Sequence, residues 1–155
     1  MCRNSAIQPS TRVVPNSAPA VMPADPAREA RTFEWMNWLS GWLHSVAFAQ
    51  IWRPERFIAD EAGHDGVIDK GRDNILEAFA AIEHILADGR RWAVPDAFTI
   101  ADAFLIVFYR WGDAIGVNMS PYPSWTALTA RTSARPAVRT AFGKDEVALV
   151  PVAGS

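Results

Sequence analysis

The sequence has few of the residues that bind metal ions or form disulfide bonds. Cys2 is its only cysteine, and its three histidines lie at positions 44, 64 and 84. A single cysteine excludes an internal disulfide and a cysteine-based zinc site, and the histidines do not have metal-ligand spacing. We therefore expect no bound metal, no cofactor and a reducing, cytoplasmic compartment.

The sequence also lacks a run of basic residues and a long apolar run. Fifteen basic side chains are balanced by seventeen acidic ones, which argues against a nucleic-acid partner held through phosphates. The uncharged stretch Trp35–Trp52 contains Asn37, His44 and Gln50, and it is shorter than the roughly 20 apolar residues of a membrane span. The N-terminus has no apolar stretch typical of a signal peptide. We expect neither nucleic acid nor membrane as a partner.

Apolar and aromatic residues are plentiful. Half of the 155 residues are hydrophobic, and the chain contains seven tryptophans and eight phenylalanines. This length favours one domain, and this composition favours a bulky core or a large buried interface.

Prolines divide the chain into segments. Four prolines within residues 1–24 predict a loose tail. A helix is predicted from Asp25 to about Trp52, with Asp25 as its N-cap and Arg53-Pro54 as its end. Its apolar residues recur at spacings of three and four, and its tryptophans form a second stripe.

A second helix is predicted after a polar loop over residues 55–66. The apolar residues of 67–87 keep helical spacing, and Gly89 is a suitable stop. Gly71 weakens this helix slightly.

The clearest local signal is a capping box. Thr99 is a typical N-cap, and Asp102 lies three residues later, where its carboxylate can accept the Thr99 amide. A buried helix should run from there to about Ile115. We read Asp102 as a structural residue whose replacement by alanine costs about 0.5–2 kcal/mol.

Two shorter helices are predicted over 124–133 and 136–142. The sequence therefore predicts an all-α, five-helix bundle. It occupies residues 25–143, between the tail 1–24 and a second loose tail, 144–155.

At this point the motifs resemble those of one family. Phe98–Ala103, with Trp92 ahead of it, is similar to the capping segment of the glutathione transferase C-terminal domain, and Arg135-Pro136 is similar to the start of its last helix. Glu34–Trp38 and the later Leu43-His44 resemble the first helix of that domain in the bacterial beta class. The resemblance covers about residues 23–142. Pro95 departs from it, because the family usually has glycine there.

The resemblance implies an activity and two ligand-binding residues. The family conjugates glutathione, as a substrate, to electrophilic apolar compounds. Residues that match Asn37 and His44 bind glutathione in the beta class, partly across a homodimer interface, although the neighbouring basic position is Ser45 here. An α-helix would place Asn37 and His44 on one face. The substrate pocket is expected to use the following aromatic residues: Trp38, Trp42, Phe108 and Trp111.

Simpler interpretations stay open for the same residues. His44 could be an ordinary helix histidine, Asn37 a solvated amide, and the aromatic residues core or dimer contacts. No residue is predicted to be catalytic, because most of the activation in this family comes from a thioredoxin-like domain that this sequence does not show. We therefore expect weak or no transferase activity from the chain alone. The alternatives are a non-catalytic helical module that binds or dimerises, and a truncated gene product.

Overall fold

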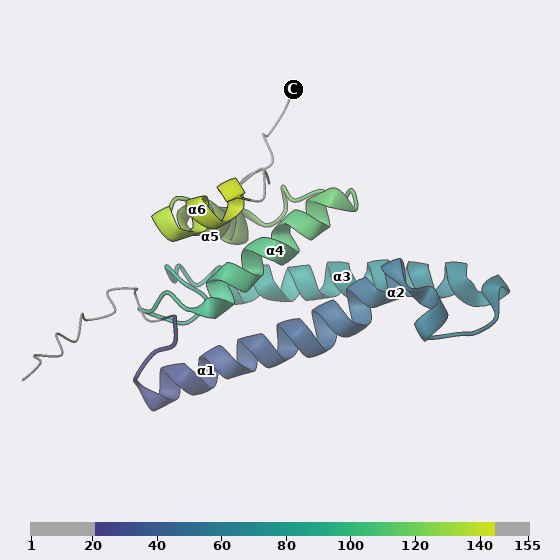
Figure 1. Cartoon of the computed structure of the whole chain (residues 1–155), viewed down its shortest axis with the longest axis horizontal. Helices are drawn as coiled ribbons and strands as arrows, with labels where there is room; N and C mark the ends of the chain where they lie inside the picture. The colour runs from purple at the N-terminus through teal and green to yellow at the C-terminus, as the bar shows by residue number, and fades with distance from the viewer. Residues whose placement is uncertain (1–20, 145–155) are drawn as a thin grey trace, which may run out of the picture.

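The computed structural model describes residues 21–144. All the secondary-structure elements in this part of the chain are helices, and a single isolated β-bridge joins Val94 and Ala97. The first three elements follow one another without a break over residues 26–52, and we call them the first rod. Together with the four later α-helices, the first rod makes the predicted all-α bundle of five helices (Figure 1). The elements are α1 (Pro26–Asn37), η1 (Trp38–Phe48), α2 (Ala49–Trp52), η2 (Pro54–Arg56), η3 (Glu61–Gly63), α3 (His64–Leu86), α4 (Ile100–Ala114), α5 (Pro123–Ser133) and α6 (Pro136–Lys144).

Both ends of the first rod are confirmed. Asp25 caps α1, since its carboxylate accepts the backbone N–H of Arg28 at 2.9 Å, and Pro26 occupies the first turn, where its missing N–H costs nothing. The rod ends at Trp52, because Arg53 leaves the helical conformation ahead of Pro54.

The middle of this rod, η1, is a π-helix, which the sequence did not predict. Its turns close from residue i to i+5 and are wider than those of an α-helix. The Ser45 hydroxyl adds a bond of the same reach, donating to the carbonyl of Ser40 at 2.7 Å. Four residues of η1 face the core: Leu39, Leu43, Ala47 and Phe48.

Helix α3 runs back along the rod in the antiparallel direction (Figure 1). It starts at His64, slightly earlier than predicted. Gly71 is buried at the contact, where a Cβ atom would lie 2.8 Å from the Cβ of Gln50 and 3.1 Å from the carbonyl oxygen of Ala47. The Asn74 side chain donates a hydrogen bond to that of Gln50 at 2.8 Å. Gly71 thus permits the close approach of the two rods, a role that helix propensity alone does not reveal.

Helix α4 begins at the predicted capping box. The Asp102 carboxylate accepts the backbone N–H of Thr99 at 2.7 Å, and the Thr99 hydroxyl accepts that of Ala101 at 3.3 Å. Leu105 and Phe108 have no exposed surface, as expected for a helix in the centre of the bundle. The last two helices follow, with α5 packed on both α4 and α3 and α6 packed on α5.

The predicted tails fall largely outside the described residues. Only 21–24 of the first tail is described, and there the carbonyl of Val21 accepts the backbone N–H of Ile100 at 2.9 Å. The helical domain therefore starts to make contacts slightly before residue 25. Residues 1–20 and 145–155 lie outside the described part of the chain.

None of the helices in residues 21–144 combines the length and the apolar character that crossing a membrane requires.

Candidate functional site

His44 lies on η1 with an exposed side chain, and its ring faces that of Trp111 on α4, with 5.5 Å between centroids. Trp111 meets the rings of Phe48, Trp52 and Phe108 edge to face, at centroid distances of 5.3, 4.8 and 5.3 Å. We call Phe48, Trp52, Phe108 and Trp111 the aromatic platform. Phe48 and Phe108 are fully buried, so the platform holds the surface beside His44 in a fixed position.

Asn37 is the last residue of α1 and is also exposed. Within residues 21–143, neither the Asn37 amide nor the His44 imidazole makes a side-chain hydrogen bond, so both are available to a ligand. Their predicted alignment assumed 3.6 residues per turn. That period does not apply through η1, because its turns are wider. The structure therefore offers two free polar groups on one rod, and their position on a common face stays a prediction.

The four aromatic residues predicted for a substrate pocket occupy different environments. Trp42 is 41% exposed, Trp38 and Trp111 are half-buried, and Phe108 is fully buried. Phe108 forms the wall behind Trp111 and has no surface of its own for a ligand. Trp38 lies away from the platform, with its ring 6.0 Å from that of Trp35. The structure thus brings His44 together with Trp111, but it does not gather all four aromatic residues around one space.

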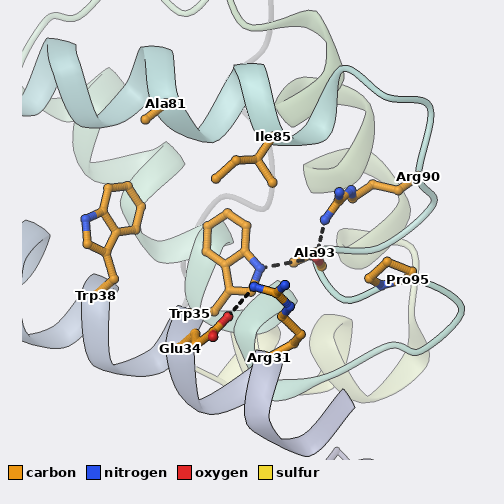
Figure 2. A pocket seen from close by; sticks show the side chains of 9 residues that line it. All are labelled: Arg31, Glu34, Trp35, Trp38, Ala81, Ile85, Arg90, Ala93 and Pro95. Atoms are coloured by element: carbon orange, nitrogen blue, oxygen red, sulfur yellow. Dashed lines mark hydrogen bonds and ion pairs between the residues drawn. The ribbon is translucent and has the colours of Figure 1, made fainter. Parts of the chain in front are cut away.

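A hollow of about 670 Å³ opens between α1, the last turns of α3 and the segment that follows α3 (Figure 2). We call it the α1–α3 hollow. Trp38, Ala81 and Ile85 supply apolar walls, and Trp35 lies at its centre in Figure 2. The charged residues that line it are Arg31, Glu34 and Arg90.

The peptide groups of Ala93 make the hydrogen bonds that hold the floor of this hollow together. Its carbonyl accepts a hydrogen bond from the indole N–H of Trp35 at 3.2 Å and another from the guanidinium of Arg90 at 3.1 Å (Figure 2). Its N–H donates to the carboxylate of Asp102 at 2.8 Å. Asp102 therefore both caps α4 and fixes the segment below the hollow.

Asp102 has no exposed surface. Burial raises the pKa of its carboxyl group above the ordinary value, and the N–H groups of Ala93 and Thr99 offset part of this rise by stabilising the carboxylate. Each of its two carboxylate oxygens accepts a backbone N–H, from Ala93 and from Thr99.

The charges around the α1–α3 hollow are largely paired within the protein. Arg31 bonds to Glu34 at 2.6 Å, and Arg90 bonds to Asp88 at 2.7 Å. Hydrogen bonds from Arg90 lower the pKa of Asp88 to about 2. The polar rim of the hollow therefore offers little unpaired charge to a ligand.

The sequence contains no motif that predicts this hollow. Arg31, Arg90 and Ala93 belong to no motif, and only the tryptophan stripe that includes Trp35 and Trp38 pointed toward it. The hollow forms because three segments far apart in the chain meet, and no local pattern in the sequence encodes that meeting. In the described residues, no group of three or more His, Cys, Asp or Glu side chains is placed to hold a metal ion.

The comparisons with known proteins point to one family. Residues 65–140 match the family model described as the glutathione S-transferase C-terminal domain. The glutathione S-transferase GstA of Escherichia coli O157:H7 is 27% identical over 123 residues, which cover 79% of this chain and 57% of GstA.

Two solved structures show the same fold. A glutathione transferase homologue from Sulfitobacter, with bound glutathione, matches 81% of this chain and 59% of its own with a TM-score of 0.73 and 24% identity. A sphingomonad glutathione S-transferase complexed with glutathione matches 83% and 60% with a TM-score of 0.68 and 25% identity. The chain thus spans less than two thirds of the length of each of these three proteins.

Proposed function

Because residues 65–140 place this chain in the glutathione S-transferase C-terminal domain family, we propose that it forms the helical half of an enzyme that conjugates glutathione to electrophilic apolar compounds. The observation that carries this proposal is the likeness to GstA and to the sphingomonad enzyme, joined with the exposed, unpaired His44 beside the aromatic platform. We further propose a cytoplasmic location and no cofactor, with glutathione as a substrate.

The two free polar groups suit glutathione chemically. Glutathione carries two carboxylates and a thiol, and its transfer to an electrophile requires the thiolate. An amide N–H from Asn37 and an imidazole N–H from His44 can donate hydrogen bonds to negatively charged oxygen or sulfur, which favours the ionised form. The His44 ring packs beside that of Trp111, with 5.5 Å between centroids, so the donor lies next to the proposed apolar surface.

An apolar co-substrate would find its contacts on the exposed aromatic surface of the same region. Trp42 and Trp52 are 41% and 46% exposed, and Trp111 is half-buried. Burying such side chains contributes about 25 cal/mol per Å² of apolar surface, so an electrophile with an aromatic body gains most of its affinity there. We keep Trp42 and Trp111 as the proposed contacts on this surface and assign Phe108 the role of supporting Trp111, whereas Trp38 lines the separate α1–α3 hollow.

The domain supplies only part of what the reaction needs. In the family that this chain resembles, a thioredoxin-like domain binds the glutathione backbone, and the aligned region here covers 57% of GstA. We therefore propose that residues 1–155 alone have weak or no transferase activity.

The test compares two proteins in one assay. One is the 155-residue chain, and the other is a fusion in which the part of GstA that precedes the aligned region is joined ahead of that region. Conjugation of glutathione to a chlorinated nitroaromatic compound is followed by absorbance. We expect turnover by the fusion and little or none by the chain alone. A well-folded fusion that gives no turnover would refute the proposed activity.

A second candidate function, a helical module that dimerises without catalysis, has support from exposed apolar side chains of the first rod. Phe33, Trp42 and Trp52 lie on the first rod and are 58%, 41% and 46% exposed. Large apolar side chains of this kind commonly mark contacts between proteins. Size-exclusion chromatography with light scattering would give the mass of a dimer if these side chains form a contact between copies, and that of a monomer if they do not.

A further inference from the structure

A second hollow, of about 370 Å³, lies between α3 and the connection from α4 to α5. It shares no lining residue with the α1–α3 hollow or with the aromatic platform. Arg72, Ile75 and Leu76 contribute from α3, where spacings of three and four residues place them on one helix face. The connection, residues 115–122, closes the other side.

The walls of this second hollow are mainly apolar. Ile75 has no exposed surface and Tyr122 is only 8% exposed, so both form its base. Leu76 is 46% exposed, an unusual position for a large apolar side chain. A hollow with such walls can bury the apolar part of a small molecule, and its volume lies within the range of about 300–1,000 Å³ that is typical of ligand sites.

The polar groups in the second hollow are hydrogen-bond donors without protein acceptors. The Tyr122 hydroxyl makes no hydrogen bond within residues 21–143, and the residue as a whole is 8% exposed. The oxygen of the Asn118 side chain accepts the backbone N–H of Ser120 at 3.0 Å, which leaves its NH₂ group to donate. Arg72 forms no ion pair in the described residues, and no Asp or Glu lines the hollow.

Burial raises the pKa of the Tyr122 hydroxyl, so it keeps its proton and remains a donor at neutral pH. Although the Tyr122 residue is largely buried, its hydroxyl retains contact with solvent, so it can donate to a ligand that enters the hollow. Three donors, one of them cationic, define the partner as an anionic acceptor.

We propose that the second hollow binds a small organic carboxylate with an apolar body. The planar guanidinium of Arg72 matches the geometry of a carboxylate, and the Tyr122 hydroxyl and the Asn118 amide can donate to the same group. The apolar body lies against Ile75 and Leu76. The site is separate from the residues proposed to bind glutathione, so it does not depend on the transferase function.

The experiment uses the full 155-residue chain and two matched probes, 3-phenylpropionate and its neutral amide. Binding is followed by ¹H–¹⁵N NMR. We expect saturable shifts centred on the amides of Arg72, Leu76 and Tyr122, with a Kd on the order of 1 mM for the carboxylate, as its small size implies. The neutral amide should bind about tenfold more weakly, because it lacks the charge that Arg72 recognises.

Three variants separate a specific site from general adsorption. Arg72→Met should weaken binding of 3-phenylpropionate about tenfold or more, and Tyr122→Phe, which keeps the ring, should weaken it roughly threefold to tenfold. Lys70→Met removes a positive charge from the same helix outside the hollow and should leave binding unchanged. Shifts that do not saturate by about 20 mM, or that are equal in Arg72→Met and the parent chain, would overturn the proposal.

Discussion

The carboxylate of Glu83 on α3 accepts the backbone N–H of Trp125 on α5 at 3.0 Å. Its other oxygen accepts the N–H of Ser124, also at 3.0 Å. Tyr122, at the N-cap position of α5, provides no side-chain hydrogen bond. One helix therefore caps another, across more than forty positions of sequence, and orients α5 so that Trp125 is fully buried in the core.

Replacing Glu83 should show how much this cap contributes to the free energy of unfolding. We predict that Glu83→Ala lowers the free energy of unfolding by about 1–2 kcal/mol, because two N–H groups at the start of α5 lose a charged acceptor. Urea unfolding followed by tryptophan fluorescence measures the change. Glu77→Ala is the matched control, since Glu77 is exposed on the same helix and should change stability by less than about 0.5 kcal/mol.

Asp102 should stabilise the fold by more than a residue that only caps its own helix. Its carboxylate accepts the N–H groups of both Thr99 and Ala93 in a fully buried position. Leaving a buried donor unsatisfied costs about 1–3 kcal/mol, so we predict that Asp102→Ala destabilises the chain by about 2–4 kcal/mol. Urea unfolding measures this loss, and a loss below about 1 kcal/mol would show that the link to Ala93 contributes little.

Gly71 and Gly66 provide a matched pair on α3. A Cβ atom at Gly71 would meet Gln50 and Ala47, whereas one at Gly66 would meet nothing within 4 Å. We predict that Gly71→Ala destabilises the chain by about 1–3 kcal/mol through overpacking, while Gly66→Ala stabilises it by roughly 0.5–1 kcal/mol through helix propensity. Thermal unfolding distinguishes the two, and equal shifts in Tm would contradict the close approach of α3 to the first rod.

The Asp88–Arg90 pair predicts a distinct titration. NMR of the side-chain carboxyl carbon should give a pKa of about 2 for Asp88, returning toward the ordinary 3.8 in Arg90→Ala. Because the pKa is lowered in the folded state, the pair stabilises the fold above about pH 3.8 and loses this effect as the pH falls toward 2. Arg91→Ala is the control and should leave the Asp88 titration unchanged.

Sequence patterns predicted the fold more completely than the site. Asp25-Pro26, Arg53-Pro54 and the Thr99–Asp102 box mark helix ends through contacts between near neighbours, and the structure confirms each of them. The apolar spacing of the first rod likewise predicted the buried residues Leu39, Leu43 and Ala47, but Phe33, at the start of the same pattern, is 58% exposed. These features are local, so a single sequence is enough to identify them.

The features that escaped prediction join distant segments or depart from regular geometry. The caps that Glu83 and Asp102 provide to other segments, and the close contact at Gly71, depend on how helices meet in space. The π-helical turns of η1 are not signalled by an α-helical period, so sequence spacing alone does not place Asn37 and His44 on one face. The site residues themselves came from the family resemblance, and their role in binding glutathione stays a prediction.

Calorimetric titration of glutathione into the fusion protein tests this role most directly. A hydrogen bond to a charged group contributes about 1.5–3 kcal/mol, so we predict that His44→Ala weakens glutathione binding roughly tenfold to a hundredfold. His84→Ala removes an exposed histidine from α3 and should leave the Kd unchanged. If the His44→Ala fusion folds and binds glutathione with the affinity of the parent fusion, His44 is an ordinary helix histidine and the proposed site is wrong.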